Sequence, residues 1–432
     1  TISFEPLHQK MLKFTQKTVQ AQKRLFSPLT RSFSSEPHRP EICQAGSFLD
    51  IGSRRIFNTE HDQFRESCRS FFLDEVVPHH AEWEKQGHIS RDVWLKAGSM
   101  GLLGVNSPEE YGGLGADILF AAVTWEEQMY AVGAPSGPGF SLHSDIVMPY
   151  LVHLGTEEQK KKYLPAMCRG EQILAIAMTE PGAGSDLAGV RTSANKVDGG
   201  YVLNGSKIYI TNGYMADVTV VVAKTDPSKG AHGMSLFLVE NGTKGFSKGT
   251  PLAKMGLKAQ DTCELFFEDM FIPDECLLGE ENKGFYYLME ELPQERLLLA
   301  VEAQSRGEMA FEQARGFVNE RMAFGKPLFD KQVVRHKLAD MKTALSVNRA
   351  FVDQCLELHS KQKLDAATAS MAKLASTENS WKICDEAVQL HGGAGYMLEY
   401  PVTRALADAR VGRIYGGANE IMKEVIARTC KI

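Results

Sequence analysis

The sequence Ala177-Met178-Thr179-Glu180-Pro181-Gly182-Ala183-Gly184-Ser185-Asp186 contains two hydroxyls, two carboxylates and two glycines in one short turn. Pro181 fixes its own φ and has no N–H, while the two glycines can adopt backbone conformations that other residues rarely reach. Backbone amides and the hydroxyls of Thr179 and Ser185 can therefore point into a cleft and bind a ligand. A Pro-Gly-x-Gly turn alone is equally typical of an ordinary surface loop, so the rest of the chain decides between the two.

The composition of the chain is that of a globular protein with two or three domains. It has 432 residues, of which 43% are hydrophobic and 24% are charged. The longest apolar runs, such as residues 218–223, are far shorter than the roughly 20 residues that a membrane span requires. The net charge of −6 argues against a nucleic-acid-binding surface.

The first part of the chain differs from the remainder in charge. Residues 1–43 contain seven Lys or Arg and three Asp or Glu, a net charge of +4 against −10 for the rest. They are also rich in Ser and Thr, which predicts an organellar transit peptide over 1–43 that is removed after import. A disordered basic arm is the alternative. Because the chain begins at Thr1, Met11 is a candidate for the true start.

The eight cysteines form no C-x-x-C pair and show no metal-ligand spacing. We therefore expect buried thiols in a reducing compartment, and no metal site.

Hydrophobic periodicity predicts three domains in the order helical, β, helical, with bounds 44–174, 175–283 and 284–432. Residues 201–210 contain two β-rich runs around Asn204-Gly205, which predicts a hairpin, and further strands are expected at 218–223, 234–239 and 265–271. Apolar residues from 334 to 356 recur at spacings of 3, 4 and 7, which predicts one long amphipathic helix. Gly325-Lys326-Pro327 is expected to end the helix before it, and His391-Gly392-Gly393 the helix after it.

The stretch at 177–186, together with several motifs between about Ile56 and Ala427, resembles the acyl-CoA dehydrogenases. These enzymes bind FAD and oxidise the Cα–Cβ bond of fatty acyl thioesters. The resemblance implies a multidomain α and β fold with an amino-terminal helical domain, a middle β-barrel-like domain and a carboxy-terminal helical bundle. It also implies a homotetramer, built as a dimer of dimers, in which a neighbouring subunit completes each FAD site.

The resemblance places FAD contacts in several separated segments. An aromatic ring at 209 would lie against the flavin, the hydroxyl at 211 would reach flavin N5, and Arg321 would reach the pyrophosphate. Without the family pattern, such residues are more often a core or cross-strand aromatic, a turn residue and a helix-end charge, and Gly392-Gly393 is usually a helix C-cap. The implied FAD contacts are Ile176, Ala177, Met178, Thr179, Glu180, Pro181, Gly182, Ala183, Gly184, Ser185, Tyr209, Ile210, Thr211, Arg321, Gln332, Gln389, Leu390, His391, Gly392, Gly393, Ala418, Asn419 and Glu420.

The catalytic base departs from the commonest family pattern. Many members carry a glutamate in a Tyr-Glu-Gly segment, but here the matching segment is Tyr415-Gly416-Gly417. Either the chain is an inactive flavoprotein, or the base lies elsewhere. Glu295 matches the helical glutamate of the isovaleryl-CoA and long-chain branches, so we favour Glu295 as the base, although a first-turn glutamate alone usually only complements the helix dipole. Gly416 is expected to leave room for the acyl chain and to offer its amide to the thioester oxygen.

The sequences of residues 232–240, 254–261 and 291–296 are most similar to the long-chain branch of the family, and the isovaleryl-CoA branch is the second most similar. The resemblance therefore implies a mitochondrial matrix enzyme of fatty acid β-oxidation that passes electrons to electron-transferring flavoprotein. The candidate substrate contacts are Ser185, Ala231, His232, Tyr286, Pro293, Gln294, Arg296, Gly416 and Gly417.

Two other functions compete with this interpretation. An acyl-CoA oxidase would use the same flavin chemistry. Its usual peroxisomal targeting signal, Ser-Lys-Leu, is missing here, because the sequence ends in Thr429-Cys430-Lys431-Ile432. An assembly protein with the same fold and no activity is the second alternative, and Glu295 argues against it.

Overall fold

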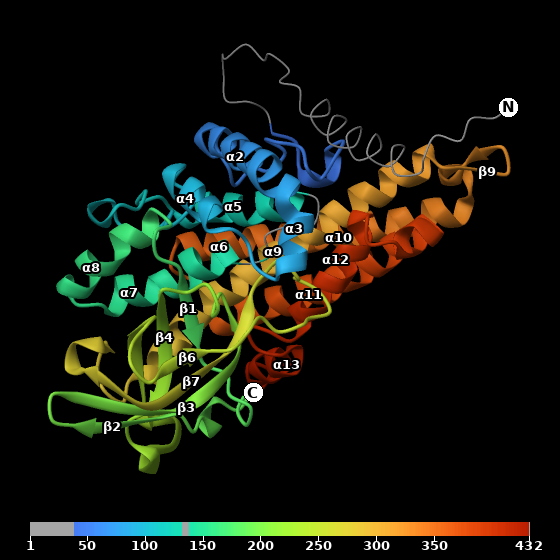
Figure 1. The fold of residues 1–432 in the computed structure, drawn as a ribbon. Coiled ribbons are helices and arrows are strands. Elements are labelled where there is room, and N and C mark those ends of the chain that lie inside the picture. Colours follow the sequence, from blue (N-terminus) through green and yellow to red (C-terminus); the bar gives the residue numbers. More distant parts are fainter. Residues whose placement is uncertain (1–38, 132–136, 138, 432) are drawn as a thin grey trace, which may run out of the picture.

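The computed structural model describes residues 39–131, 137 and 139–431, and it confirms the helical, β, helical order (Figure 1). Most of the predicted transit peptide, including Met11, lies outside these residues. The helices before the sheet are η1(Ile42–Gln44), α2(Thr59–Phe71), η2(Phe72–Val76), η3(Val77–His79), α3(His80–Gln86), α4(Arg91–Ser99), η4(Glu109–Tyr111), α5(Ile118–Tyr130), α6(Gly139–Ser141), η5(Leu142–Val147), α7(Met148–Leu154) and α8(Glu157–Cys168).

Local sequence signals explain where these helices begin. Asn58 caps α2 by accepting from the amides of Glu60 and His61, and Thr156 caps α8 by accepting from the amide of Gln159. In both helices the third residue returns a side-chain bond to the cap, which satisfies amides that have no partner inside the helix.

The middle of the chain forms one mixed sheet. Its strands are β1(Leu174–Ala177), β2(Ser193–Val197), β3(Gly200–Thr211), β4(Val218–Lys224), β5(Met234–Glu240), β6(Phe246–Lys248), β7(Thr262–Pro273) and β8(Leu277–Leu278), with short helices η6(Leu187–Gly189), η7(Pro227–Gly233) and η8(Asp274–Cys276) between them. The strand order is β6-β7-β3-β2-β4-β5-β8, and β1 pairs with β4.

The hairpin expected at Asn204-Gly205 is wrong. Both residues lie inside β3, and the tight turn is Asp198-Gly199, between β2 and β3. Gly205 instead occupies a bulge with φ +148°, where a Cβ would come within 2.5 Å of the Thr192 hydroxyl. Glycine is therefore needed here for close packing, and a bulge and a hairpin turn share the same residue preference.

The C-terminal part is a helical bundle around one very long helix, α9(Gly284–Glu320). The remaining elements are β9(Met322–Ala323), β10(Lys326–Pro327), η9(Leu328–Asp330), α10(Gln332–Ser360), α11(Ala366–His391), η10(Gly392–Tyr396), α12(Pro401–Ala409), η11(Arg410–Arg413) and α13(Asn419–Arg428). The long amphipathic helix and the helix ends before residues 325 and 392 are confirmed. Between α9 and α10 the chain forms a two-residue hairpin, with Phe324 and Gly325 both at positive φ.

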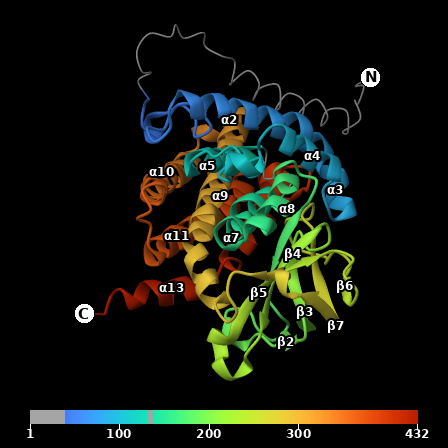
Figure 2. The same ribbon diagram turned by 90° about the vertical axis from the view of Figure 1, so that its left-hand side faces the viewer.

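The long helix joins the two ends of the molecule. The sheet lies beside the first part of α9, whereas the β9 hairpin lies at the opposite end of the bundle (Figure 1). Figure 2 shows the amino-terminal helices above α9 and the sheet below them. A buried ion-pair network ties the amino-terminal helices to the carboxy-terminal bundle, because Arg349 of α10 contacts both Glu126 of α5 and Glu308 of α9.

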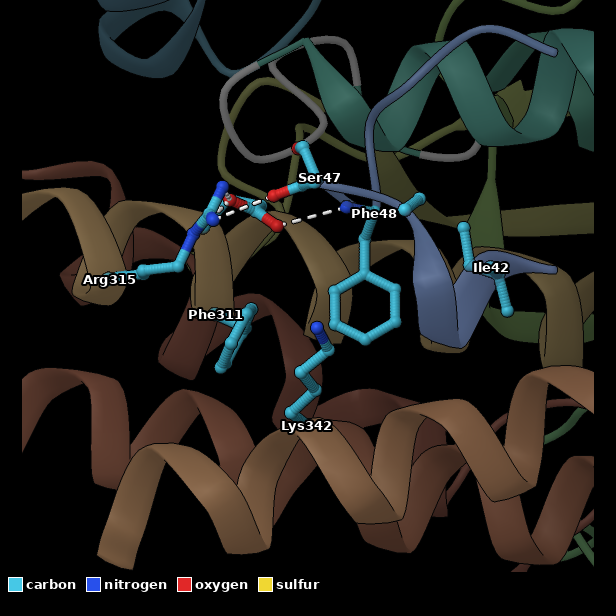
Figure 3. A pocket seen from close by; sticks show the side chains of 9 residues that line it. Ile42, Ser47, Phe48, Phe311, Arg315 and Lys342 are labelled. Carbon is cyan, nitrogen blue, oxygen red and sulfur yellow. Dashed lines mark hydrogen bonds and ion pairs between the residues drawn. The ribbon is translucent and has the colours of Figure 1, made fainter. Parts of the chain in front are cut away.

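The segment that follows the predicted transit peptide packs on α9 and α10. The Phe48 amide donates to Glu312 (2.9 Å), and the Arg315 guanidinium donates to the Gly46 carbonyl (2.7 Å) (Figure 3). Beside these contacts lies a hollow of about 30 Å³, lined also by Ile42, Phe311 and Lys342. Its volume suits one or two waters and is too small for an acyl thioester.

The eight cysteines all lie in the described part of the chain, and none forms a disulfide. The expectation that all are buried is wrong for Cys43 and Cys430, which are exposed, and Cys276 is half-buried. Within residues 39–431, apart from the gaps at 132–136 and 138, no helix is both long and apolar enough to cross a membrane.

Candidate active site

Glu295 lies on α9 with only 6% of its surface exposed. The Tyr150 hydroxyl of α7 donates a hydrogen bond to its Oε1 (2.9 Å). Burial raises the pKa of the Glu295 carboxyl to about 7, and the neighbouring charge of Glu291 adds to this, while the Tyr150 hydrogen bond and Arg296 oppose it. A carboxylate whose pKa lies near neutrality is suited to accept and release a proton.

Gly416 lies in the turn between η11 and α13, with φ +60°. A Cβ at this position would come within 2.2 Å of the Leu299 side chain. Leu299 follows Glu295 by four residues on α9, so both project from the same face of the helix. The Gly416 turn therefore packs against the face of α9 that carries Glu295. The expected empty room at Gly416 is wrong, because Leu299 fills that space.

The turn at 177–186 is closed by a pair of backbone bonds between Glu180 and Ala183. The Glu180 carboxylate faces inward and accepts from Lys207 Nζ (2.9 Å) and from the amides of Arg191 and Thr192. Although burial opposes it, Lys207 and these bonds hold the pKa of Glu180 below its usual range. The Glu180 side chain is thus committed to the loop and is not available to a ligand.

The remaining residues of the turn divide by exposure. The side chains of Ala177 and Ala183 are buried and leave only their backbone to a ligand, whereas Pro181, Gly182, Gly184 and Ser185 are exposed, and Ile176, Met178 and Thr179 are half-buried. A Cβ at Gly182 or Gly184 would meet nothing within 4 Å. Gly182 and Gly184 therefore face open space, and packing inside the chain does not require glycine at either position.

Tyr209 lies next to this turn, since the Ile208 amide donates to the Thr179 carbonyl (2.9 Å). Its φ is +63°, and 66% of its surface is exposed. A positive φ costs an aromatic residue about 1–3 kcal/mol and is typical of functional sites. The bulge in β3 thus turns the ring outward, while Ile210 is buried and Thr211 is half-buried.

A second group of candidate residues lies at the far end of the bundle. Arg321 caps α9, Gln332 begins α10, and residues 389–393 end α11, where His391 stacks on Phe317 of α9 (ring centroids 4.3 Å). Gln389, Gly392 and Gly393 are exposed, whereas Leu390 is buried. Arg321 follows Glu295 by 26 residues, which is about 39 Å along a helix. Within one chain, this group therefore lies far from Glu295.

Ala418, Asn419 and Glu420 lie beside Gly416 at the start of α13. The Asn419 side chain is buried and accepts from Lys373 Nζ (2.9 Å), while its amide donates to Thr377 (3.0 Å) and Glu378 (2.9 Å). These bonds fix the turn, and they leave Asn419 no side-chain group for a cofactor.

The proposed substrate contacts follow the first half of α9. His232 stacks on Tyr286 (5.2 Å between ring centroids), and Ala231 is half-buried beside it in sequence. Tyr286 precedes Glu295 by nine residues, about 14 Å along the helix. The intervening Pro293 lies inside α9, and Gln294 donates to the Asp145 carbonyl (2.7 Å).

Arg296 points elsewhere than expected. Its guanidinium is buried and donates to the Ser370 hydroxyl of α11 (3.2 Å). It therefore lies in the interface between α9 and α11, where it affects the site by charge.

Sequence reasoning missed Tyr150, Leu299 and Lys373. Only Leu299 had a usable signal, its spacing of four from Glu295.

Comparisons with known proteins agree with this geometry. Three family descriptions match consecutive parts of the chain: "Acyl-CoA dehydrogenase, N-terminal domain" at 58–171, the middle domain at 175–270 and the C-terminal domain at 282–431. The mitochondrial long-chain specific acyl-CoA dehydrogenase of Mus musculus is 59% identical over 399 residues, which is 92% of each chain.

Solved structures give the same result. An acyl-CoA dehydrogenase from Geobacillus kaustophilus has a TM-score of 0.86 and 48% identity, covering 88% of this chain and all of that one. An acyl-CoA dehydrogenase from Bacillus anthracis in complex with FAD has a TM-score of 0.82 and 34% identity, covering 87% of this chain and 66% of that one. The chain therefore belongs to the acyl-CoA dehydrogenase family.

Proposed function

We propose that this protein converts long-chain fatty acyl-CoA to trans-2-enoyl-CoA in mitochondrial β-oxidation. The observation that carries the proposal is the shared face of α9, on which Glu295 lies one turn from Leu299, the residue that meets the Gly416 turn. The 59% identity to a mitochondrial long-chain enzyme supports the substrate class and the compartment, which we take to be the matrix. Electron-transferring flavoprotein is the proposed electron acceptor.

The cofactor of this reaction is FAD in our proposal. The outward Tyr209 ring suits a flat ring system, and the open space at Gly182 and Gly184 suits a ligand that approaches the backbone closely. We assign the flavin ring to the side of Tyr209, Thr179, Ser185 and Thr211. When bound, the flavin supplies the acceptor for the hydride that leaves the β-carbon.

The residues of the chain supply the proton chemistry. Glu295 removes the α-proton as a carboxylate, and Tyr150 holds that carboxylate in place. As the proton leaves, negative charge develops on the thioester oxygen. The amide of Gly416 is the proposed donor to this oxygen, and loss of one such donor typically costs about 10²–10³ in rate.

The second group of residues completes the cofactor site from a neighbouring subunit. Arg321 lies about 39 Å along α9 from Glu295, farther than one dinucleotide reaches, and Gln332 and residues 389–393 lie at the same end of the bundle. Large apolar side chains are exposed at this end, with Phe324 95% and Tyr396 81% exposed. Such exposure is typical of an interface, and we propose the homotetramer that the family pattern implies.

Replacing Arg321 by alanine is expected to lower the flavin content of the purified protein. Arg321 is exposed at the end of α9, where a charge contributes only about 0.3–1 kcal/mol to folding. The melting temperature of the apoprotein should therefore change little. Flavin absorbance per chain is compared in the two proteins, and equal flavin content would contradict the prediction. Sedimentation of the wild type tests the site shared between subunits, and a flavin-loaded monomer would contradict it.

Replacing Tyr150 by phenylalanine is expected to shift the pH profile of flavin reduction to higher pH. The Tyr150 hydrogen bond favours the charged form of Glu295, so its loss raises the pKa of that carboxyl further above about 7. Since a hydrogen bond to a charged group contributes about 1.5–3 kcal/mol, the shift should be about 1–2 pH units. The rate should fall at pH 7 and increase as the pH rises above this value. An unchanged inflection would show that Tyr150 does not tune the base.

One experiment separates this function from its alternatives. Initial rates are measured across straight acyl-CoA lengths and branched substrates, with electron-transferring flavoprotein or oxygen as the acceptor. A maximum at long chains with the flavoprotein supports the proposal. A maximum at isovaleryl-CoA, fast reaction with oxygen, or no bleaching of the flavin by any acyl-CoA would indicate a branched-chain enzyme, an oxidase or an inactive assembly protein, respectively.

A further inference from the structure

Lys373 of α11 is a fully buried lysine that contacts the Gly416-Gly417 turn. It has 0% exposure, and its Nζ donates to the Gly417 carbonyl (2.8 Å) and to Asn419 Oδ1 (2.9 Å). Both acceptors are neutral. The carboxylates of Glu378 and Glu420 act on Lys373 by their charge and not through a direct hydrogen bond.

A second cation lies close to Lys373. The Arg296 guanidinium donates to Ser370, one turn before Lys373 on α11, and its Nε has no hydrogen-bond partner. Burial together with the nearby Arg296 lowers the pKa of Lys373 to about 8, against the opposing charges of Glu420 and Glu378. Glu378 and Glu420 act on Lys373, and Glu295 acts on Arg296, in the direction that favours the charged forms, yet the pKa of each cation is still lowered by burial. Packing alone therefore does not favour these two charges here.

Hydrogen bonds on both sides of the Gly416-Gly417 turn hold it against α11. Arg413 before the turn donates to Glu378 (2.8 Å), and Asn419 after it donates to Thr377 and Glu378. Between these anchors, Lys373 is the α11 side chain that hydrogen-bonds the glycine pair. Gly416 and Gly417 both have positive φ. Because glycine can adopt many other backbone conformations, the hydrogen bond from Lys373 favours the conformation seen in this turn.

We propose that Lys373 is a positioning residue for the dehydrogenation, which fixes the Gly416-Gly417 turn and, with Arg296, adds positive charge where the thioester oxygen becomes negative. The inference rests on the proposed function, because the Gly416 amide is the proposed donor to that oxygen. The α-proton still passes to Glu295, and the hydride still leaves from the β-carbon to the bound flavin. Lys373 acts in its protonated form and exchanges no proton with the substrate.

The test compares flavin-loaded Lys373→Met with the wild type. The probe is an aryl-conjugated enoyl-CoA, whose absorption moves to longer wavelength when its carbonyl oxygen is polarised. We expect Lys373→Met to lose most of this shift and about 10²-fold in the rate of flavin reduction, as misplacement by about 1 Å can do. Flavin content should be unchanged. Lys337→Met is the matched control, since Lys337 pairs with Glu386 about 20 Å farther along α11.

The outcomes distinguish this inference from the proposed function. Glu295→Gln should keep the spectral shift and lose flavin reduction, whereas a wild type that shows neither would overturn the proposed function itself. A full shift and near wild-type rate in Lys373→Met would overturn the role of Lys373. If that variant does not fold, Lys373→Gln retains a neutral donor without the charge, and an undiminished shift in this variant would equally overturn it.

Discussion

Glu295→Gln is expected to bind FAD and acyl-CoA as the wild type does and to lose flavin reduction. Glutamine has nearly the shape of glutamate and can still accept the Tyr150 hydrogen bond (2.9 Å in the wild type), but it cannot take up the α-proton. Loss of a general base usually removes about 10²–10⁴ of the rate. Stopped-flow bleaching of the flavin by a long-chain acyl-CoA measures the effect.

Glu291→Gln is the matched control for this variant. Glu291 lies one turn before Glu295 on α9 and pairs with His153 (2.6 Å). Its charge contributes to raising the pKa of Glu295, so its loss should lower that pKa and shift the pH profile slightly while bleaching persists. Bleaching of Glu295→Gln at near wild-type speed would reject Glu295 as the base.

Moving the carboxylate from α9 to the Gly416 turn is expected to restore part of the lost activity. Glu295 and a glutamate at 416 would approach the same α-carbon from two backbone positions. The structure adds a requirement, because a Cβ at 416 meets the Leu299 side chain at 2.2 Å. The variant that tests relocation therefore combines Glu295→Gly, Gly416→Glu and Leu299→Ala.

The recovery should be partial. Residue 416 has φ +60°, which costs a non-glycine residue about 1–3 kcal/mol, and a displaced carboxylate loses about 10²-fold per 1 Å. The control is Glu295→Gly with Leu299→Ala, which has the same cavity and no carboxylate. If the triple variant reduces its flavin no faster than this control while binding FAD and substrate, the two positions are not interchangeable.

Local sequence patterns were sufficient for much of the fold. Periodicity at residues 334–356 predicted α10, and the change of period near residue 175 predicted the sheet that begins with β1. Such patterns succeed because an amphipathic helix or an alternating strand depends on residues a few positions apart. The Asn204-Gly205 hairpin failed for the same reason, since only Thr192, from the segment before β2, distinguishes a bulge from a turn.

The chemistry of the site needed the tertiary structure. By itself, the sequence determined that a carboxylate stands at 295 and a glycine at 416, together with the family to which both positions belong. Their proximity, the Tyr150 hydrogen bond and the buried Lys373 depend on helices that lie far apart in the chain and pack together. Burial and neighbouring charge then raise the pKa of Glu295 to about 7. No local pattern encodes these effects, because they arise only when distant segments exclude water from the same space.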